Sequence, residues 1–215
     1  MYKQTAIQYE YVPEEEYSEL QCIFEQQILP EVRPMLRANG ITFQCVLVGS
    51  ASRHMVTRRT DRTKGFDLDY NMHLQKCYED PKETKLEIIR AFDVVAPQLG
   101  FKHCEDSTTV ITLKKVSRSR IRYSFDIALL FDDGDDVFYI HHDKDRRRYL
   151  WESRGGQMHI DDKIDCIQTY YSANVYDVIA DDYLHLKNIN HDKDKRSFSL
   201  LAEAINNEYN HIQQV

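Results

Sequence analysis

Apolar and polar residues alternate without interruption over residues 66–74. Five apolar side chains fall on one side of an extended chain, namely Phe66, Leu68, Tyr70, Met72 and Leu74. The other side holds Asp67, Asp69, Asn71 and His73. Because the side chains of a strand point alternately to its two faces, this pattern predicts a strand that is buried on one face only. The carboxyl groups of Asp67 and Asp69 then share the polar face.

Further strands are predicted where shorter apolar runs occur. The segment 43–48 is apolar almost throughout, which predicts a buried strand that ends at Gly49-Ser50. Additional strands are expected over 110–115, 121–131 and 137–140. Alternation in the second of these places Asp126 on its polar side. Residues 50–65 lack apolar periodicity, and we expect a loop there.

Helical spacing of apolar residues predicts the remaining elements. A first helix is expected over residues 13–29, after which Pro30 and Pro34 should bend or end it. A second helix should begin at Pro81, and from Asp161 onward the pattern is helical. The predicted fold class is therefore α+β, with a small mixed or antiparallel sheet flanked by helices and a helical C-terminal third.

Composition narrows the class of protein. The 215-residue chain is 42% hydrophobic and 29% charged, as in globular proteins, and its net charge of −7 argues against general coating of nucleic acid. An anion-binding site therefore has to be a local basic cluster. No apolar run reaches the roughly 18 residues of a membrane span, and no apolar segment follows Met1–Gln4, so neither membrane insertion nor secretion is expected. Five scattered cysteines without a CxxC pair fit reduced thiols in the cytoplasm.

Three carboxyl groups are the strongest candidates for chemistry. Asp67 and Asp69 share a strand face, and Asp126 joins them if its strand lies alongside. Converging carboxylates repel one another, and divalent cations remove that conflict. Hard oxygen ligands suit Mg²⁺ or Mn²⁺, and two such ions about 3.5–4 Å apart can hold the attacking and leaving oxygens of a phosphoryl displacement. The alternative is that Asp67 and Asp69 form the solvated face of an edge strand.

The segment between Gly49-Ser50 and Asp67 supplies a local basic cluster. It contains one acid, Asp61, and five cations, which are Arg53, Arg58, Arg59, Arg62 and Lys64. Backbone N–H groups around Gly49-Ser50, with the Ser50 hydroxyl, can hold the outer phosphates of a nucleotide, and glycine permits close approach of the backbone. Taken alone, such a charge run is more often a solvated surface.

These residues resemble the signature of the DNA polymerase β-type nucleotidyltransferase superfamily. The resemblance rests on Gly49-Ser50-Ala51-Ser52-Arg53, Asp67-Leu68-Asp69 and Phe125-Asp126-Ile127. It implies that Asp67 and Asp69 bind two Mg²⁺ ions, and that Asp126 binds the catalytic ion and helps to deprotonate an acceptor hydroxyl. It also implies a nucleotide-binding group made of Gly49, Ser50, Ser52 and Arg53, in which Ser50 holds the triphosphate.

A weaker similarity to the oligoadenylate-synthetase and cGAS-like branch lies near the C-terminus. It rests on Tyr183-Leu184-His185-Leu186-Lys187 followed by Arg196-Ser197-Phe198, and it implies that Lys187 and Ser197 contact the triphosphate. By itself, Lys187 would be an ordinary surface lysine. We further expect a nucleotidyltransferase catalytic core over residues 1–150 and a C-terminal helical segment over residues 151–215 that packs on the core.

The resulting hypothesis is a metal-dependent nucleotidyltransferase, of the EC 2.7.7 type, that moves an NMP or dNMP from an NTP to a hydroxyl and releases pyrophosphate. A nucleotide acceptor would give an oligonucleotide or cyclic signal, as in bacterial antiviral defence. RNA, a protein or a small molecule would be the acceptor of a toxin-type or antibiotic-modifying enzyme. The short chain leaves room for a partner protein or a homo-oligomer. Two other classes remain, a non-catalytic nucleotide-binding module and a metal-dependent nuclease, because three carboxylates also serve hydrolysis.

Overall fold

The computed structural model describes residues 8–153, 160–192 and 194–214. The chain divides into two compact units. One, which we call the sheet unit, comprises Val12–Val56 and Thr63–Gly155; the other, the helical unit, comprises Met1–Tyr11, Thr57–Arg62 and Gly156–Val215. Met1–Gln4, on which the expectation of no secretion signal rests, lie outside the described residues. The functional division predicted at residue 150 stays a prediction.

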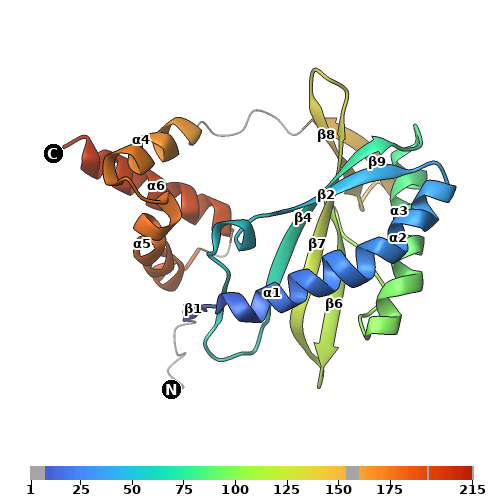
Figure 1. Ribbon diagram of the computed structural model, residues 1–215, viewed down its shortest axis with the longest axis horizontal. Helices are drawn as coiled ribbons and strands as arrows, with labels where there is room; N and C mark the ends of the chain where they lie inside the picture. Colours follow the sequence, from blue (N-terminus) through green and yellow to red (C-terminus); the bar gives the residue numbers. More distant parts are fainter. Residues whose placement is uncertain (1–7, 154–159, 193, 215) are drawn as a thin grey trace. The chain divides into compact units, whose positions relative to one another are not determined.

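A mixed sheet forms the centre of the sheet unit (Figure 1). Its described strands run in the order β2 (Thr42–Val48), β4 (Phe66–Lys76), β7 (Arg120–Asp132), β6 (Val110–Ser117) and β5 (Glu105–Asp106). Strands β8 (Val137–Asp143) and β9 (Arg148–Ser153) continue from the end of β7. β4 and β7 are parallel, whereas the other pairs are antiparallel. The predicted α+β class is therefore confirmed.

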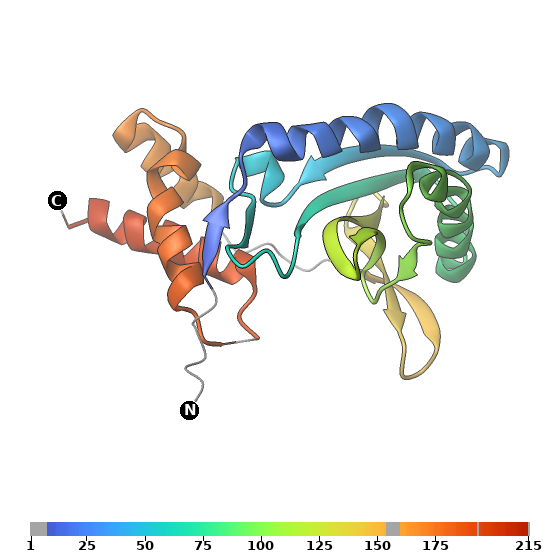
Figure 2. The same cartoon turned by 90° about the horizontal axis from the view of Figure 1, so that it is seen from below.

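Helices cover the apolar face of this sheet. α1 (Glu14–Ile23), η1 (Phe24–Ile28) and α2 (Leu29–Ala38) form one continuous rod, and α3 (Pro81–Val95), which leads into the 3₁₀ turn η3 (Ala96–Leu99), contacts α2 (Figure 2). The Phe24 ring centroid lies 4.2 Å from that of Tyr70 on β4 and 4.8 Å from that of Phe125 on β7. Burial alternates along β4 from Phe66 to Leu74, as the sequence predicts. The face that carries the aspartates of β4 is therefore the face turned away from the helices.

The first helix does not end at its prolines, so one of the two outcomes that the sequence allowed, an end at Pro30 or Pro34, is wrong. Phe24–Ile28 form a π-helical turn, in which the Leu29 N–H donates to the carbonyl of Phe24, five residues earlier. This wider turn precedes Pro30 and relieves the clash between a proline ring and the carbonyl four residues before it. Pro34 then removes only one backbone hydrogen bond, and the buried apolar side chains of α2 keep the helix on the core.

Two other sequence predictions are wrong in detail. The run 43–48 is an edge strand in which Gln44 and Val46 are exposed, because an apolar run does not reveal how many of its faces are covered. Residues 50–65 are not a loop throughout, since they contain the 3₁₀ turn η2 (Ala51–Arg53) and strand β3 (Thr57–Arg59). β3 pairs with β1 (Tyr9–Tyr11), and local periodicity cannot reveal a three-residue strand whose partner lies 48 residues away.

The helical unit combines the β1–β3 ribbon with α4 (Asp161–Tyr171), α5 (Val175–Ile189) and α6 (Ser197–Ile212). These three helices confirm the predicted helical C-terminal third. The Tyr11 hydroxyl donates to the Ala180 carbonyl at 2.6 Å, and the Tyr9 N–H donates to the Asn188 side-chain oxygen at 2.6 Å, so β1 is bonded to α5. Among the helices that the structure describes, none is long and apolar enough to cross a membrane.

Candidate active site

The three predicted carboxylates lie on neighbouring strands of the sheet unit. In the parallel register of β4 and β7, Asp69 lies opposite Asp126, and Asp67 lies opposite Ser124. Asp67 and Asp69 are two residues apart on one strand, so all three carboxylates project from the same face. The strand adjacency on which the sequence argument depended is therefore present.

Burial and mutual repulsion govern the ionisation of these acids. Burial, together with the nearby carboxylates of Asp126 and Asp67, raises the pKa of Asp69 to about 6, although Arg53 opposes the shift. Burial also raises the pKa of Asp126, against the effect of a hydrogen bond from Thr112. Without a cation, three negative charges at this place are therefore unfavourable. A divalent cation favours the fully ionised form, which is the physical reason for expecting metal binding here.

Two hydroxyl groups hold two of the three carboxylates. Ser124 Oγ donates to Asp67 Oδ1, and Thr112 Oγ1 donates to Asp126 Oδ1 at 2.6 Å. Both hydroxyl residues are buried, with exposed fractions of 3% for Ser124 and 6% for Thr112. Alternation along β7 places Ser124 on the face of Asp126, but nothing in the sequence shows that Thr112 of β6 lies opposite Asp126. These two contacts were therefore missed by the sequence prediction.

The turn after β2 brings the backbone against the acids. Gly49 adopts a left-handed conformation with φ +72°, and a Cβ there would lie 3.0 Å from Asp69 Cβ and overlap the Asp69 carboxylate. The Gly49 carbonyl accepts hydrogen bonds from Ser52 Oγ at 3.0 Å and from Arg53 Nη1 at 2.9 Å. Ser50 precedes η2, and its carbonyl accepts from the Arg53 N–H at 3.2 Å. These four predicted nucleotide-binding residues form one tight turn, and their contact with phosphate stays a prediction.

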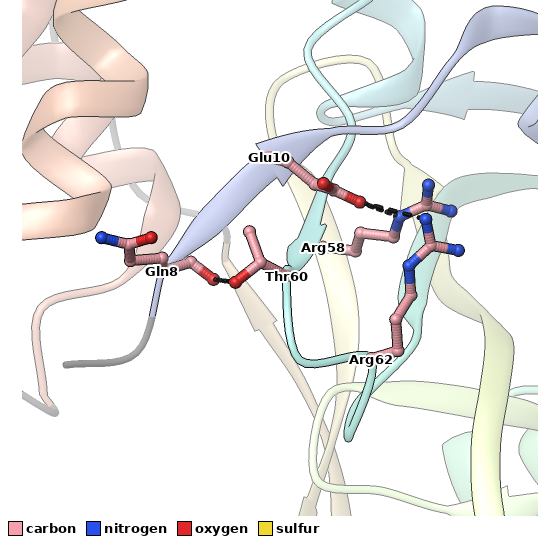
Figure 3. Close-up of polar contacts among 5 residues, drawn as sticks. All are labelled: Gln8, Glu10, Arg58, Thr60 and Arg62. Carbon is pink, nitrogen blue, oxygen red and sulfur yellow. Dashed lines mark hydrogen bonds and ion pairs between the residues drawn. The ribbon is translucent and has the colours of Figure 1, made fainter. Parts of the chain in front are cut away.

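The basic segment is partly neutralised by acids, one of which is distant in sequence. Arg58 is 7% exposed, and its Nε lies 2.8 Å from a carboxylate oxygen of Glu10, which Arg62 also approaches at 3.3 Å (Figure 3). Glu10 reaches this place through the pairing of β1 with β3. Arg59 pairs with Asp61 at 2.7 Å. Three of the five cations expected to attract phosphate are thus in ion pairs within the helical unit.

Lys187 and Ser197 are neighbours in the helical unit. Lys187 Nζ lies 3.3 Å from Ser197 Oγ and donates to Thr57 Oγ1 at 2.6 Å. The ammonium group also lies 5.0 Å from the ring centroid of Tyr9 and 5.3 Å from that of Tyr183. The two residues that the resemblance selects are therefore adjacent, and their contact with a triphosphate stays a prediction.

The carboxylates suit Mg²⁺ or Mn²⁺ if a nucleotide completes the ligand set. Over residues 8–153, 160–192 and 194–214, no three Asp, Glu, His or Cys side chains are grouped so as to hold a metal ion alone. Mg²⁺ in nucleotide-using enzymes usually binds one or two protein carboxylates, with substrate phosphates as further ligands. Asp69 and Asp126, which are paired in register and interact electrostatically, provide such carboxylates, and Asp67 is two residues away.

Comparison with known proteins identifies the class of fold. No protein-family model matches the sequence, and no curated protein matches it significantly. Solved structures of the nucleotide-synthesising enzyme DncV, the cyclic AMP-GMP synthase of Vibrio cholerae, do match. The complex of DncV with the linear intermediate 5′ pppA(3′,5′)pG has a TM-score of 0.56 at 14% identity, and the GTP-bound form has a TM-score of 0.55 at 16% identity.

The DncV structures match most of this chain but only about half of their own length. Each alignment covers 91% of this chain but only 54% and 52% of the two DncV chains, so the chain spans about half the length of these structural neighbours. At such low identity the similarity concerns the fold. The chain shares the fold of these DncV structures over most of its length, which agrees with the fold that the sequence resemblance implies.

Proposed function

We propose that the chain is a nucleotidyltransferase that moves a nucleoside monophosphate from an NTP to the hydroxyl of a second nucleotide, giving a linked or cyclic nucleotide signal. The observation that carries the proposal is the register of β4 and β7, which sets Asp69 beside Asp126 with Asp67 on the same face. The similarity of fold to a synthase solved with GTP and with a linear dinucleotide supports a nucleotide as the acceptor.

The proposed reaction is a substitution at the α-phosphorus of the NTP. The acceptor oxygen forms a bond to this phosphorus, while the bond from phosphorus to the oxygen that bridges to the β-phosphate breaks. Pyrophosphate leaves with the electron pair of that bond. The hydroxyl proton passes to a carboxylate, which we assign to Asp126 on the resemblance. Divalent cations held by the three aspartates would supply charge neutralisation during this substitution.

The residues of the chain contribute position and charge. Asp67, Asp69 and Asp126 would hold the cations on the sheet face opposite to the one that α1, α2 and α3 cover. The turn of Gly49 and Ser50 would present backbone groups to the outer phosphates, as in other phosphate-binding turns. On the resemblance, Lys187 and Ser197 would contact the triphosphate. Most of the rate enhancement then comes from orientation of the two reactants and from preorganised electrostatics.

Turnover of NTPs tests the proposal. The purified chain is incubated with each NTP and with NTP pairs in Mg²⁺ or Mn²⁺, and pyrophosphate and all products are identified by mass spectrometry. We expect pyrophosphate together with a product that carries a new phosphodiester bond. Asp69→Asn and Asp126→Asn should each lower the rate by about 100-fold or more, because each removes a charged ligand at the reacting phosphate.

The matched control is Asp132→Asn, which removes an exposed carboxylate at the end of the strand that carries Asp126. It should transfer nucleotide at the wild-type rate. Cleavage of nucleic acid in the absence of any NTP would replace the proposal with a nuclease. NTP binding without pyrophosphate under all these conditions would indicate a non-catalytic nucleotide-binding module.

A further inference from the structure

Ser124 and Thr112 donate hydrogen bonds to two of the three carboxylates of the candidate site, those of Asp67 and Asp126. In register, Ser124 of β7 lies opposite Asp67 of β4, and Thr112 of β6 lies opposite Asp126 of β7. Each hydroxyl thus contacts the carboxylate of the residue directly opposite it on the adjacent strand. Backbone pairing fixes the spacing of such opposed residues, so the donor and the acceptor are held at hydrogen-bond distance by the strands themselves.

Among the residues that the structure describes, only one oxygen of each of these two carboxylates accepts a hydrogen bond. Asp67 and Asp126 each accept one hydrogen bond, in both cases at Oδ1. In the part of the chain that the structure describes, neither carboxylate has another hydrogen bond or ion pair within contact distance. Each therefore keeps the acceptor capacity of Oδ2, since an ionised carboxylate has about four lone-pair sites on two oxygens.

The third acid, Asp69, lies against the backbone of Gly49 and receives no hydrogen bond from a hydroxyl group that the structure describes. It lies across from Asp126 in register and packs its carboxylate against the Cα of Gly49, where no side chain is present. The two hydroxyl contacts are thus made to Asp67 and Asp126, whereas Asp69 lies against the backbone at Gly49. Buried hydroxyls without a partner are costly, so both donors have a strong preference for the carboxylate they face.

We propose that Ser124 and Thr112 are positioning residues that fix Asp67 and Asp126 in the orientation needed to bind divalent cations. The inference rests on the proposed function, because it assumes that these carboxylates bind metal. In this role the hydroxyls act through the two carboxylates and would not themselves bind the cations. Outer groups that orient metal ligands typically change metal affinity by about 10- to 100-fold when they are removed.

Manganese binding tests this proposal without recourse to activity. The full chain is titrated with Mn²⁺ in the presence of a non-hydrolysable NTP analogue, and free Mn²⁺ is measured by electron paramagnetic resonance. Thr112→Val, which keeps the shape of the side chain, and Ser124→Ala should each raise the Kd for Mn²⁺ by about tenfold or more. Thr112→Ser keeps the hydroxyl and should stay within about threefold of the wild type.

Thr84→Val is the matched control for loss of stability. Thr84, in the first turn of α3, is fully buried. Its hydroxyl forms hydrogen bonds with the backbone of Tyr78, which precedes the helix, and not with a carboxylate. It should destabilise the fold but leave the Kd for Mn²⁺ unchanged. Wild-type affinity in Thr112→Val and Ser124→Ala, or an equal loss in Thr84→Val, would overturn the positioning role alone. Absence of Mn²⁺ binding by the wild-type chain would overturn the proposed function as well.

Discussion

At the residue scale, Gly49 has two physical reasons to be glycine. Its φ of +72° lies in the left-handed region, which costs other residues about 1–2 kcal/mol. In addition, a Cβ would overlap the carboxylate of Asp69. The sequence argument supports glycine at this place through close approach of a phosphate, whereas the structure shows that the glycine also makes room for one of the acids.

Gly49→Ala and Gly40→Ala separate these two effects. Gly40 has a similar φ of +79°, but no atom lies within 4 Å of a Cβ built there. Gly40→Ala should lower the free energy of unfolding by about 1–2 kcal/mol, and Gly49→Ala by at least that much, because the overlap with Asp69 adds to the cost of the backbone conformation. Only Gly49→Ala should also lower the rate of nucleotidyl transfer, by about 100-fold, because it displaces Asp69. Equal transfer rates in the two variants, measured beside urea unfolding curves, would contradict this role.

At the element scale, a buried ion pair joins α3 to β5. Lys85 of α3 has a side chain that is 1% exposed, and its Nζ lies 2.8 Å from Asp106 Oδ1 and 2.6 Å from the Ser107 carbonyl. The Tyr149 hydroxyl of β9 donates to the other oxygen of Asp106. Burial alone would raise the pKa of Asp106, but the hydrogen bonds from Lys85 and Tyr149 outweigh burial and lower it.

Asp106→Asn should therefore lower the free energy of unfolding at pH 7 by about 3–5 kcal/mol, since it leaves Lys85 as a buried charge without an ionic partner. The lowered pKa means that the folded state binds fewer protons than the unfolded state at about pH 4 and below. The stability from Asp106 is thus present above that pH and lost as the pH falls through the folded pKa.

Urea unfolding from pH 7 down to pH 2 measures this dependence. The difference between wild type and Asp106→Asn should narrow below about pH 4. Asp135→Asn, at an exposed position in the turn between β7 and β8, should differ from the wild type by less than about 0.5 kcal/mol. A difference between wild type and Asp106→Asn that stays constant over the whole range would show that the charge of Asp106 does not stabilise the fold.

The elements that the sequence predicts are those with local periodicity. The alternation from Phe66 to Leu74 and the helical spacing after Asp161 correspond to β4 and to the three C-terminal helices. The continuation of the first helix beyond Pro30 was not predictable, because it depends on the π-helical turn before it. Strands β1, β3 and β5 were not predicted either, since each has only two or three residues and is too short to show a period. Strand β9, which pairs with the neighbouring β8, was also not predicted.

The residues of the candidate site also fall into those that the sequence predicts and those that depend on tertiary structure. The alternation of apolar and polar residues along β4 is enough to predict that Asp67 and Asp69 share a face. Asp126 can be added to them once its strand is placed beside β4. The hydroxyl of Thr112 could not be assigned from sequence, because the register of β6 against β7 decides which residue faces Asp126. Likewise, the basic segment is not a free cationic patch, since Glu10 joins Arg58 only through tertiary pairing.

At the scale of the whole molecule, the chain combines a net charge of −7 with a fold that in its structural neighbours accommodates nucleotides. Phosphate binding by such an acidic chain requires cations, either as side chains or as bound metal. Three of the five cations of the basic segment are in ion pairs, which leaves more of the neutralisation to divalent ions at the aspartates. Metal binding at β4 and β7 is therefore the central claim.

A crystal structure of the full chain with Mn²⁺ and a non-hydrolysable ATP analogue, with data collected at the manganese edge, measures this directly. We expect anomalous-difference density beside the carboxylates of Asp67, Asp69 and Asp126, with the phosphates of the analogue on the opposite side of the ions. The same density should be absent from Asp69→Asn/Asp126→Asn crystals prepared in parallel. Analogue bound with no manganese at these carboxylates, or manganese bound only elsewhere, would contradict the claim.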